Sequence, residues 1–164
     1  GVAAMAASRR NIDYILKNMF PMIISFDKLN QVRHIRFLKD MDGLAAHMEK
    51  HRALLEPKFR AVLAILDEGL SGCGSIARWT KPNGGYFLSL YTLGGCAKRT
   101  VQLCREAGVV LTDAGAAYPY GVDPQDSNIR IAPSYPTPEE LAVAVELFVL
   151  CVKLVSIDKI LEEK

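Results

Sequence analysis

The chain has 164 residues, of which 50% are hydrophobic, and its 20 basic residues nearly balance 18 acidic ones. This apolar content is enough for the core of one globular domain without metal or disulfide cross-links. A formal net charge of +2 is too small for a surface that binds nucleic acid, so we expect no nucleic-acid partner.

The amino-terminal part combines a short apolar run with one helix. Residues 1–7 lack the basic segment and the length of a signal peptide, and we expect them to be a strand joined in mid-course. A start without methionine in such a run suggests a fragment of a longer protein, and a processed start or a trimmed tag is an equally good explanation from the sequence. Ser8 can cap a helix that ends near Met19, before Pro21.

A long helical region follows, and its length predicts a helix that connects two domains. Asp27 can cap it, and apolar residues recur every three or four positions as far as Leu66. Gly43 and Pro57 mark two places where it could kink, although Pro57 could also lie in the first turn of a new helix.

Residues 75–79 and 85–91 have the composition of two strands. Between them lies the run Lys81-Pro82-Asn83-Gly84, in which Asn-Gly after proline is a strong turn signal. We therefore predict an antiparallel hairpin. Lys81 could contact a cofactor, but a solvated hairpin lysine is the commoner case.

The rest of the chain predicts a helix over 95–107, short strands over 109–111 and 128–131, and a terminal helix. The terminal helix begins at Thr137, where Thr-Pro-Glu-Glu forms a capping box, and ends near residue 161. Its apolar stretch is shorter than the roughly 20 residues that a membrane span needs, so we expect no membrane partner. The fold class is α/β, a small, mainly antiparallel sheet covered by helices.

One arginine stands out in the strand predicted over 128–131. Ile129 and Ile131 alternate with Asn128 and Arg130, so one face would pack while the other presents a guanidinium. That group has five fixed donors and matches a carboxylate or phosphate. Arg130 either lies on a solvated face or faces an anionic ligand. Residues 115–121, rich in glycine and tyrosine, suit a loop that approaches a ligand closely.

Cysteine and histidine spacing favours neither a metal site nor a disulfide framework. The four cysteines contain no C-x-x-C pair, and we expect buried free thiols of a reducing, cytoplasmic compartment. His47 and His51 share a helix face but lack a third ligand, so we expect no bound metal.

These motifs together resemble the carboxy-terminal small domain of fold-type I pyridoxal-phosphate aminotransferases. The resemblance rests on Pro-Asn-Gly-Gly-Tyr-Phe over 82–87, Ala-Gly-Val over 107–109 and Asn-Ile-Arg-Ile-Ala over 128–132. Three stretches, residues 1–4, 30–37 and 118–133, are similar to the bacterial aspartate aminotransferases of the class I/II, or MocR-type, group.

The resemblance implies a division of the chain and two site residues. Residues 1–26 would be the tail of a large cofactor-binding domain, and residues 27–164 an interdomain helix and the small domain. In this family the arginine of the Asn-x-Arg-Ile segment binds the substrate's α-carboxylate. Arg130 matches that arginine, and Asn128 in the same motif is our second substrate-binding residue. A preference for acidic substrates also requires a second cationic residue, which binds the side-chain carboxylate of the substrate.

The candidates for that second cation are Arg33, His34 and Arg36, although a role on the helix surface or in a dimer contact is the commoner case for each of them. Three tyrosines could line the pocket near Arg130, but packing explains each of them equally well: Tyr118, Tyr120 and Tyr135.

The resemblance also implies a cofactor that this chain would not hold by itself. The family's lysine that binds pyridoxal 5'-phosphate, and the aspartate that pairs with the cofactor ring, lie before the first residue of this chain. We therefore assign no catalytic residue and expect the chain alone to be inactive. The parent protein would be a cytoplasmic homodimer that transfers an amino group, from aspartate or another acidic amino acid, to a 2-oxo acid such as 2-oxoglutarate.

Two other interpretations remain open from the sequence. The chain could be a non-catalytic module that binds a small molecule in a MocR-type transcription regulator, with Arg130 holding an acid. It could also be a structural fragment with no activity of its own.

Overall fold

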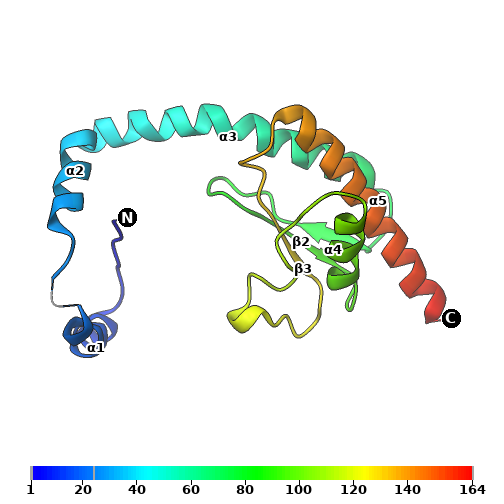
Figure 1. The fold of residues 1–164 in the computed structure, drawn as a ribbon, viewed down its shortest axis with the longest axis horizontal. Coiled ribbons are helices and arrows are strands. Elements are labelled where there is room, and N and C mark those ends of the chain that lie inside the picture. Colours follow the sequence, from blue (N-terminus) through cyan, green and yellow to red (C-terminus); the bar gives the residue numbers. More distant parts are fainter. Residues whose placement is uncertain (1, 24, 164) are drawn as a thin grey trace. The chain divides into compact units, whose positions relative to one another are not determined.

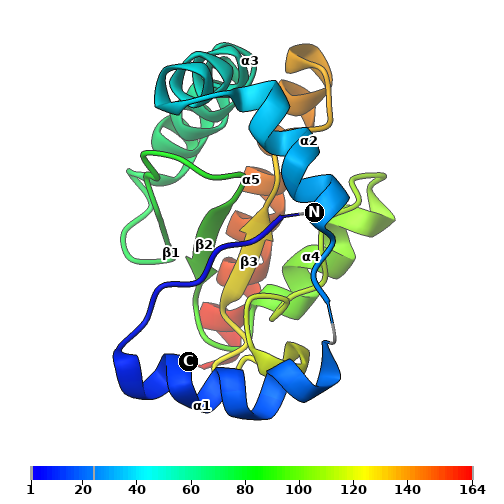
Figure 2. The same ribbon diagram turned by 90° about the vertical axis from the view of Figure 1, so that its left-hand side faces the viewer.

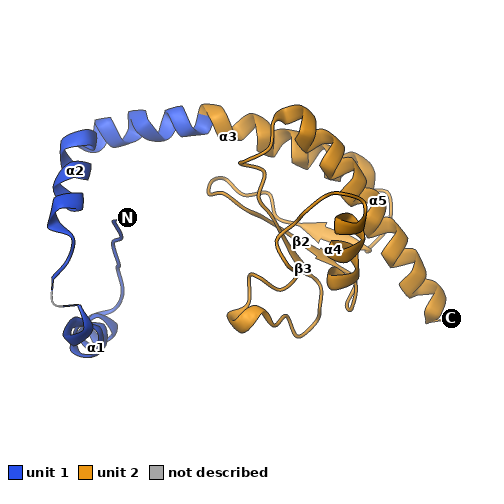
Figure 3. Cartoon of the chain, viewed as in Figure 1, with its two compact units in different colours: residues 1–52 blue, residues 53–164 orange. Residues whose placement is uncertain are grey.

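The computed structural model describes residues 2–23 and 25–163, and the chain divides into two compact units, residues 1–52 and residues 53–164 (Figure 3). The division falls inside one long helix. The boundary that the family resemblance implies, between residues 26 and 27, concerns the whole protein and stays a prediction. The elements in chain order are α1 (Arg9–Met19), η1 (Phe20–Met22), α2 (Lys28–Leu38), α3 (Met41–Leu70), β1 (Ala77–Trp79), β2 (Leu88–Thr92), α4 (Ala97–Glu106), η2 (Pro119–Gly121), β3 (Asn128–Ile131) and α5 (Pro138–Glu162) (Figure 1).

The first unit contains helices whose starts agree with the sequence. The Ser8 hydroxyl accepts a hydrogen bond from the backbone N–H of Asn11 and caps α1, which ends at Met19 as predicted. The Asp27 carboxylate accepts one from the N–H of Asn30 at 2.9 Å and caps α2. The expectation of a strand at the amino terminus is wrong for the residues described: residues 2–7 form no strand, because no described strand pairs with them.

The helical region is interrupted earlier than the sequence suggests. Lys39 has φ 65° and ends α2, and the Asp40 carboxylate then accepts a hydrogen bond from the N–H of Gly43 at 2.8 Å to start α3. Gly43 is not a kink: a Cβ there would lie 1.9 Å from the carbonyl oxygen of Leu38, so only glycine permits this close turn. α3 continues through Pro57 without interruption.

The second unit is built on a three-stranded antiparallel sheet with the order β1-β2-β3. The predicted hairpin and the strand over 128–131 are confirmed. Leu88 pairs with Ile131 and Leu90 with Ile129, so these four side chains share one face. The predicted strand over 109–111 is wrong, because those residues have no strand partner among the described residues.

Helices cover the apolar face of this sheet. α5 passes behind β2 and β3 in Figure 2, and its predicted inner stripe is buried, including Phe148 and Val152. The carboxy-terminal part of α3 contributes Leu66 to the same core. The capping box of α5 is confirmed: the Thr137 N–H donates to the Glu140 carboxylate, and the Glu140 N–H donates to the Thr137 hydroxyl.

All four cysteines lie in the second unit and are free thiols. Cys96, Cys104 and Cys151 are buried as predicted, whereas Cys73 is only half-buried. Burial, followed by the hydrogen bond and charge of the neighbouring Cys151 thiol, raises the pKa of Cys104 to about 12, so this thiol stays protonated. Within the described residues, every helix is too short or too polar to cross a bilayer.

Candidate functional site

The face of the sheet opposite the core is polar. Register places Arg78 beside Tyr91 and Tyr91 beside Asn128, while Ser89 lies beside Arg130. Directly paired residues of antiparallel strands project to the same face. The strand alternation predicted from the sequence therefore brings Asn128 and Arg130 together on a face with donors from all three strands.

Asn128 is buried without hydrogen bonds. The residue is 1% exposed, and neither the nitrogen nor the oxygen of its side-chain amide has a partner among the described residues. Leaving a buried polar group unpaired costs about 1–3 kcal/mol, so native proteins rarely do so without a reason. Both the donor and the acceptor of this amide are therefore unpaired within the described residues.

Arg130 is half-buried beside it and forms no ion pair with a described carboxylate. Its Nε is buried and unpaired, and its Cζ lies 4.6 Å from the centroid of the Phe87 ring. A guanidinium over an aromatic face is held by cation–π attraction while its outer donors stay available. Of the two interpretations left open by the sequence, this geometry favours an anionic ligand.

The loop before β3 is held by Asp123, a residue that the sequence analysis missed. Its carboxylate accepts hydrogen bonds from the N–H groups of Gln125 at 3.0 Å, Ser127 at 2.7 Å and Asn128 at 2.8 Å. Desolvation acts to raise the pKa of Asp123, but these bonds and that of the Ser127 hydroxyl outweigh it and lower the pKa. A charged acceptor thus fixes the backbone of Asn128. An aspartate shortly before a Ser-Asn pair is the local signal that could have indicated it.

The segment over residues 115–121 lies against β3, and its predicted approach to a ligand stays a prediction. Gly115 has φ 82° and donates its N–H to the carbonyl of Asn128 at 3.2 Å. A Cβ at this position would lie 2.6 Å from the carbonyl oxygen of Gly121, so a larger residue would open the loop. Tyr120 and Tyr135 are almost fully exposed, so packing does not explain either of them.

The turn after β3 is fixed by Lys58 of α3, a second residue that the sequence analysis missed. Its Nζ donates to the carbonyl oxygens of Ser134 at 2.8 Å and Pro136 at 2.6 Å. These contacts join residues 76 and 78 positions apart, and no local pattern reveals such a pairing. Asp123 and Lys58 therefore hold the two ends of the strand that carries Asn128 and Arg130.

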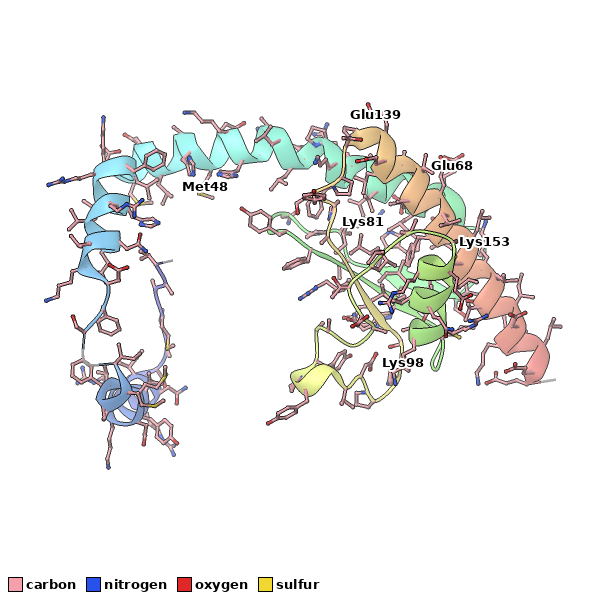
Figure 4. All side chains as sticks on the ribbon, in the orientation of Figure 1. Met48, Glu68, Lys81, Lys98, Glu139 and Lys153 are labelled. Atoms are coloured by element: carbon pink, nitrogen blue, oxygen red, sulfur yellow. The ribbon has the colours of Figure 1, made fainter. Side chains whose placement is uncertain are left out.

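Within the second unit, Lys81 does not contribute to the polar face, and the remaining polar candidates belong to the first unit. Lys81, labelled in Figure 4, forms an exposed ion pair with Asp67 at 2.9 Å in place of a ligand contact. His47 and His51 lie in the first unit with their Nε2 atoms 3.1 Å apart, and the described residues provide no third metal ligand near them. Arg33, His34 and Arg36 lie on α2, also in the first unit.

Comparisons with a family model and with curated proteins identify the same family. The family model described as "Aspartate amino-transferase" matches residues 1–164. A curated aspartate aminotransferase from Corynebacterium glutamicum is 48% identical over 128 residues, which are 78% of this chain and 29% of that protein. A protein from Mycolicibacterium smegmatis is 44% identical over all 164 residues, or 38% of its own length. These similarities give no support to a transcription regulator.

Solved structures agree in fold. A crystal structure of an aspartate transaminase from Corynebacterium glutamicum has a TM-score of 0.81 and 43% identity, covering 93% of this chain and 36% of that one. An α-aminoadipate aminotransferase from Thermus thermophilus has a TM-score of 0.68 at 20% identity, which shows a shared fold. The chain spans about a third of the length of the curated relatives it matches.

Proposed function

The chain belongs to the aspartate aminotransferase family, and from that premise we propose that the complete protein is an aminotransferase. It transfers the amino group of an acidic amino acid, such as aspartate, to a 2-oxo acid such as 2-oxoglutarate. Support for this substrate class comes from the aspartate aminotransferase of Corynebacterium glutamicum, which is 48% identical over 128 residues. The chain contributes a substrate-binding face to this reaction.

One observation carries the proposal: Asn128 and Arg130 hold buried polar atoms without partners on the same sheet face. In the proposed function the Arg130 guanidinium binds the α-carboxylate through two parallel hydrogen bonds, and the Asn128 amide donates a further one. Two-point binding fixes the orientation of the carboxylate and therefore of the Cα–H bond that is broken. Phe87 holds the guanidinium in place from its ring face.

The family implies pyridoxal 5'-phosphate, which when bound supplies an electron sink for the substrate carbanion. The polar face of this sheet does not fit covalent attachment of that cofactor, because the residues it presents from β1, β2 and β3 include no lysine. Lys58, close to the end of β3, already donates to two backbone carbonyls. We therefore propose that the cofactor is held by the remainder of the protein and that residues 1–164 alone are inactive.

We further propose that the complete protein is a homodimer and is cytoplasmic. The family resemblance supports the homodimer. Cys96, Cys104 and Cys151 support the compartment, since they are buried thiols without disulfide bonds.

Replacing Arg130 in the complete protein tests the proposed role. R130A removes the carboxylate clamp, and truncating one partner of a buried charged hydrogen-bonded pair costs about 2–5 kcal/mol. We expect kcat/KM for amino-acid substrates to fall roughly 100-fold or more. R105A is the matched control, because Arg105 is an exposed arginine paired with Asp113 in the same unit. Equal kinetics for R130A and R105A would contradict the proposal.

A second measurement tests the inactivity of the chain alone. Residues 1–164 are mixed with pyridoxal 5'-phosphate, aspartate and 2-oxoglutarate, and glutamate formation is followed. We expect none above the rate of free pyridoxal 5'-phosphate. Borohydride reduction followed by mass spectrometry should then show no lysine labelled in preference to the others, and one specifically labelled lysine would contradict the assignment.

A further inference from the structure

Two histidines of the first unit converge on one face of α3. His47 and His51 lie four residues apart, about one helical turn, so their side chains are neighbours on the helix surface. Their Nε2 atoms are 3.1 Å apart, and the ring planes meet at 81°. The ring centroids are only 4.6 Å apart, which is closer than in two rings that meet end to end. Both Nε2 atoms therefore face the same point beside the helix.

The spacing of these nitrogens is that of two ligands on one metal ion. Imidazole nitrogens bind zinc at about 2.0–2.1 Å, and two of them 3.1 Å apart would subtend an angle of about 100° at the ion. This angle lies between the values of about 90° for square-planar or octahedral sites and about 109° for tetrahedral ones. Imidazole suits copper, nickel and zinc. The pair is thus already spaced for a divalent transition-metal ion.

The hydrogen bond between the two rings is compatible with this use. Without an ion, the N–H at one Nε2 donates to the other Nε2. For both nitrogens to bind an ion, the donor ring carries its proton on Nδ1 instead, and a neutral imidazole can hold its proton on either nitrogen. Metal binding therefore changes a tautomer and releases no proton.

The pair is held in place and is open to solvent. Phe37 of α2 packs edge-on against the His47 ring, with the centroids 5.2 Å apart and the planes at 88°. A ring that a neighbour already holds loses less freedom when it binds an ion. His47 is half-buried, whereas His51 is exposed, so an ion can enter from the side of His51.

We propose that His47 and His51 form an open site for a divalent transition-metal ion, which binds copper more tightly than nickel or zinc. The sequence predicts no metal here because a closed structural site has four protein ligands, and the described residues supply no third one. An open site differs, since water completes the coordination. Two histidines four residues apart on a helix are also the pair that holds zinc in metalloproteases.

The bound ion joins two successive turns in the amino-terminal part of α3. No described residue among the first 52 is buried, so packing contributes little to the stability of this part of the helix. An ion that binds both rings only while the turn is helical stabilises that turn. The site therefore gives this part of α3 a metal-dependent clamp.

Titration of the complete protein with Cu²⁺, Ni²⁺ and Zn²⁺ in turn tests the site. We expect the wild type to bind one more ion per chain than H51A, and the affinity of that site to fall at least tenfold in H47A. H34A is the control, because His34 is an exposed histidine on α2 whose Nδ1 lies 2.7 Å from the carbonyl oxygen of Asn30. It should bind as the wild type does. Equal binding in the wild type and H51A would overturn the proposal.

Exchanging residues 51 and 52 tests the convergence of the rings. The double variant H51R with R52H keeps the composition of the chain and moves the second histidine off the shared helix face. We expect it to lose the site as H51A does. Retained binding would overturn the proposal, because it would show that the two rings need not converge.

Amide hydrogen exchange distinguishes binding by both rings from binding by one. With Zn²⁺ at ten times its Kd, the backbone amides of residues 48–52 in the complete protein should exchange about tenfold more slowly, since the turn opens only after the ion leaves. The amides of α5 serve as an internal reference, and H51A should show no slowing. Bound Zn²⁺ without slower exchange at residues 48–52 would overturn the proposed clamp.

Discussion

The two units differ in how their apolar residues are used. In residues 53–164, helices and strands share a core in which Leu66, Leu88 and Ile129 are fully buried. In residues 1–52 no described residue is buried, and apolar side chains such as Leu29 and Phe37 are 80% and 67% exposed. The helices of the first unit are therefore held by caps and local hydrogen bonds, whereas those of the second are held by packing.

This difference indicates which part of the chain unfolds cooperatively. Most helical stability in proteins comes from packing an apolar face, and short isolated helices are marginal in water. The second unit should unfold as one cooperative transition, and the first unit should open locally without changing that transition. The following substitutions, made in residues 1–164, test that contrast.

The largest effect is expected from the same substitution made in both units. L66A removes a fully buried side chain from the second unit and should lower the free energy of unfolding by about 2–5 kcal/mol. L29A removes a side chain of the first unit that is 80% exposed, and should change the free energy of unfolding by less than about 0.5 kcal/mol. Urea titration followed by the fluorescence of the single tryptophan, Trp79, measures both. Because Trp79 lies in the second unit, similar losses in L66A and L29A would show that the two units unfold together and would contradict the contrast.

An intermediate effect is expected from Asp123 as pH falls. Because its pKa is lowered below the ordinary value of 3.8, it stabilises the second unit fully above that value. This contribution is lost as pH falls through the lower pKa of the folded state. Hydrogen bonds to a charged group contribute about 1.5–3 kcal/mol, so D123N should be less stable than the wild type near neutral pH.

The urea midpoints of wild type and D123N, measured from pH 6 to pH 2.5, should converge at the acid end. D113N is the control, since Asp113 is exposed and forms a surface ion pair with Arg105. A constant difference between wild type and D123N across this pH range would contradict the role of the charge.

The smallest effect compares one helix cap from each unit. T137A removes the capping box of α5 and should cost about 1 kcal/mol of unfolding free energy, because α5 belongs to the core. S8A removes the cap of α1 and should leave the midpoint of the cooperative transition unchanged, although circular dichroism should show slightly less helix. A midpoint shift in S8A as large as that in T137A would mean that both units unfold together.

Local signals in the sequence were sufficient for much of the second unit. The Asn-Gly turn, the alternation of Asn128 to Ile131 and the capping box at Thr137 each depend on residues close together in the chain, and the structure has the predicted elements. The sequence does not predict the helix break at Lys39, because lysine rarely adopts a positive φ. Glycine and proline are the residues that usually interrupt helices, so the sequence pointed to Gly43 and Pro57 instead. The strand over 109–111 was overpredicted, because a strand needs a partner that the local sequence does not specify.

The sequence by itself determined the family, the order of the main elements and the alternation that places Asn128 and Arg130 on one face of β3. Each of these follows from residues close together in the chain. Only the tertiary structure showed that Asn128 is buried and unpaired, that Phe87 holds Arg130, and that Asp123 and Lys58 fix the two ends of β3. Burial and long-range hydrogen bonds arise where segments far apart in the chain come into contact. Patterns of neighbouring residues do not specify which distant segments make that contact.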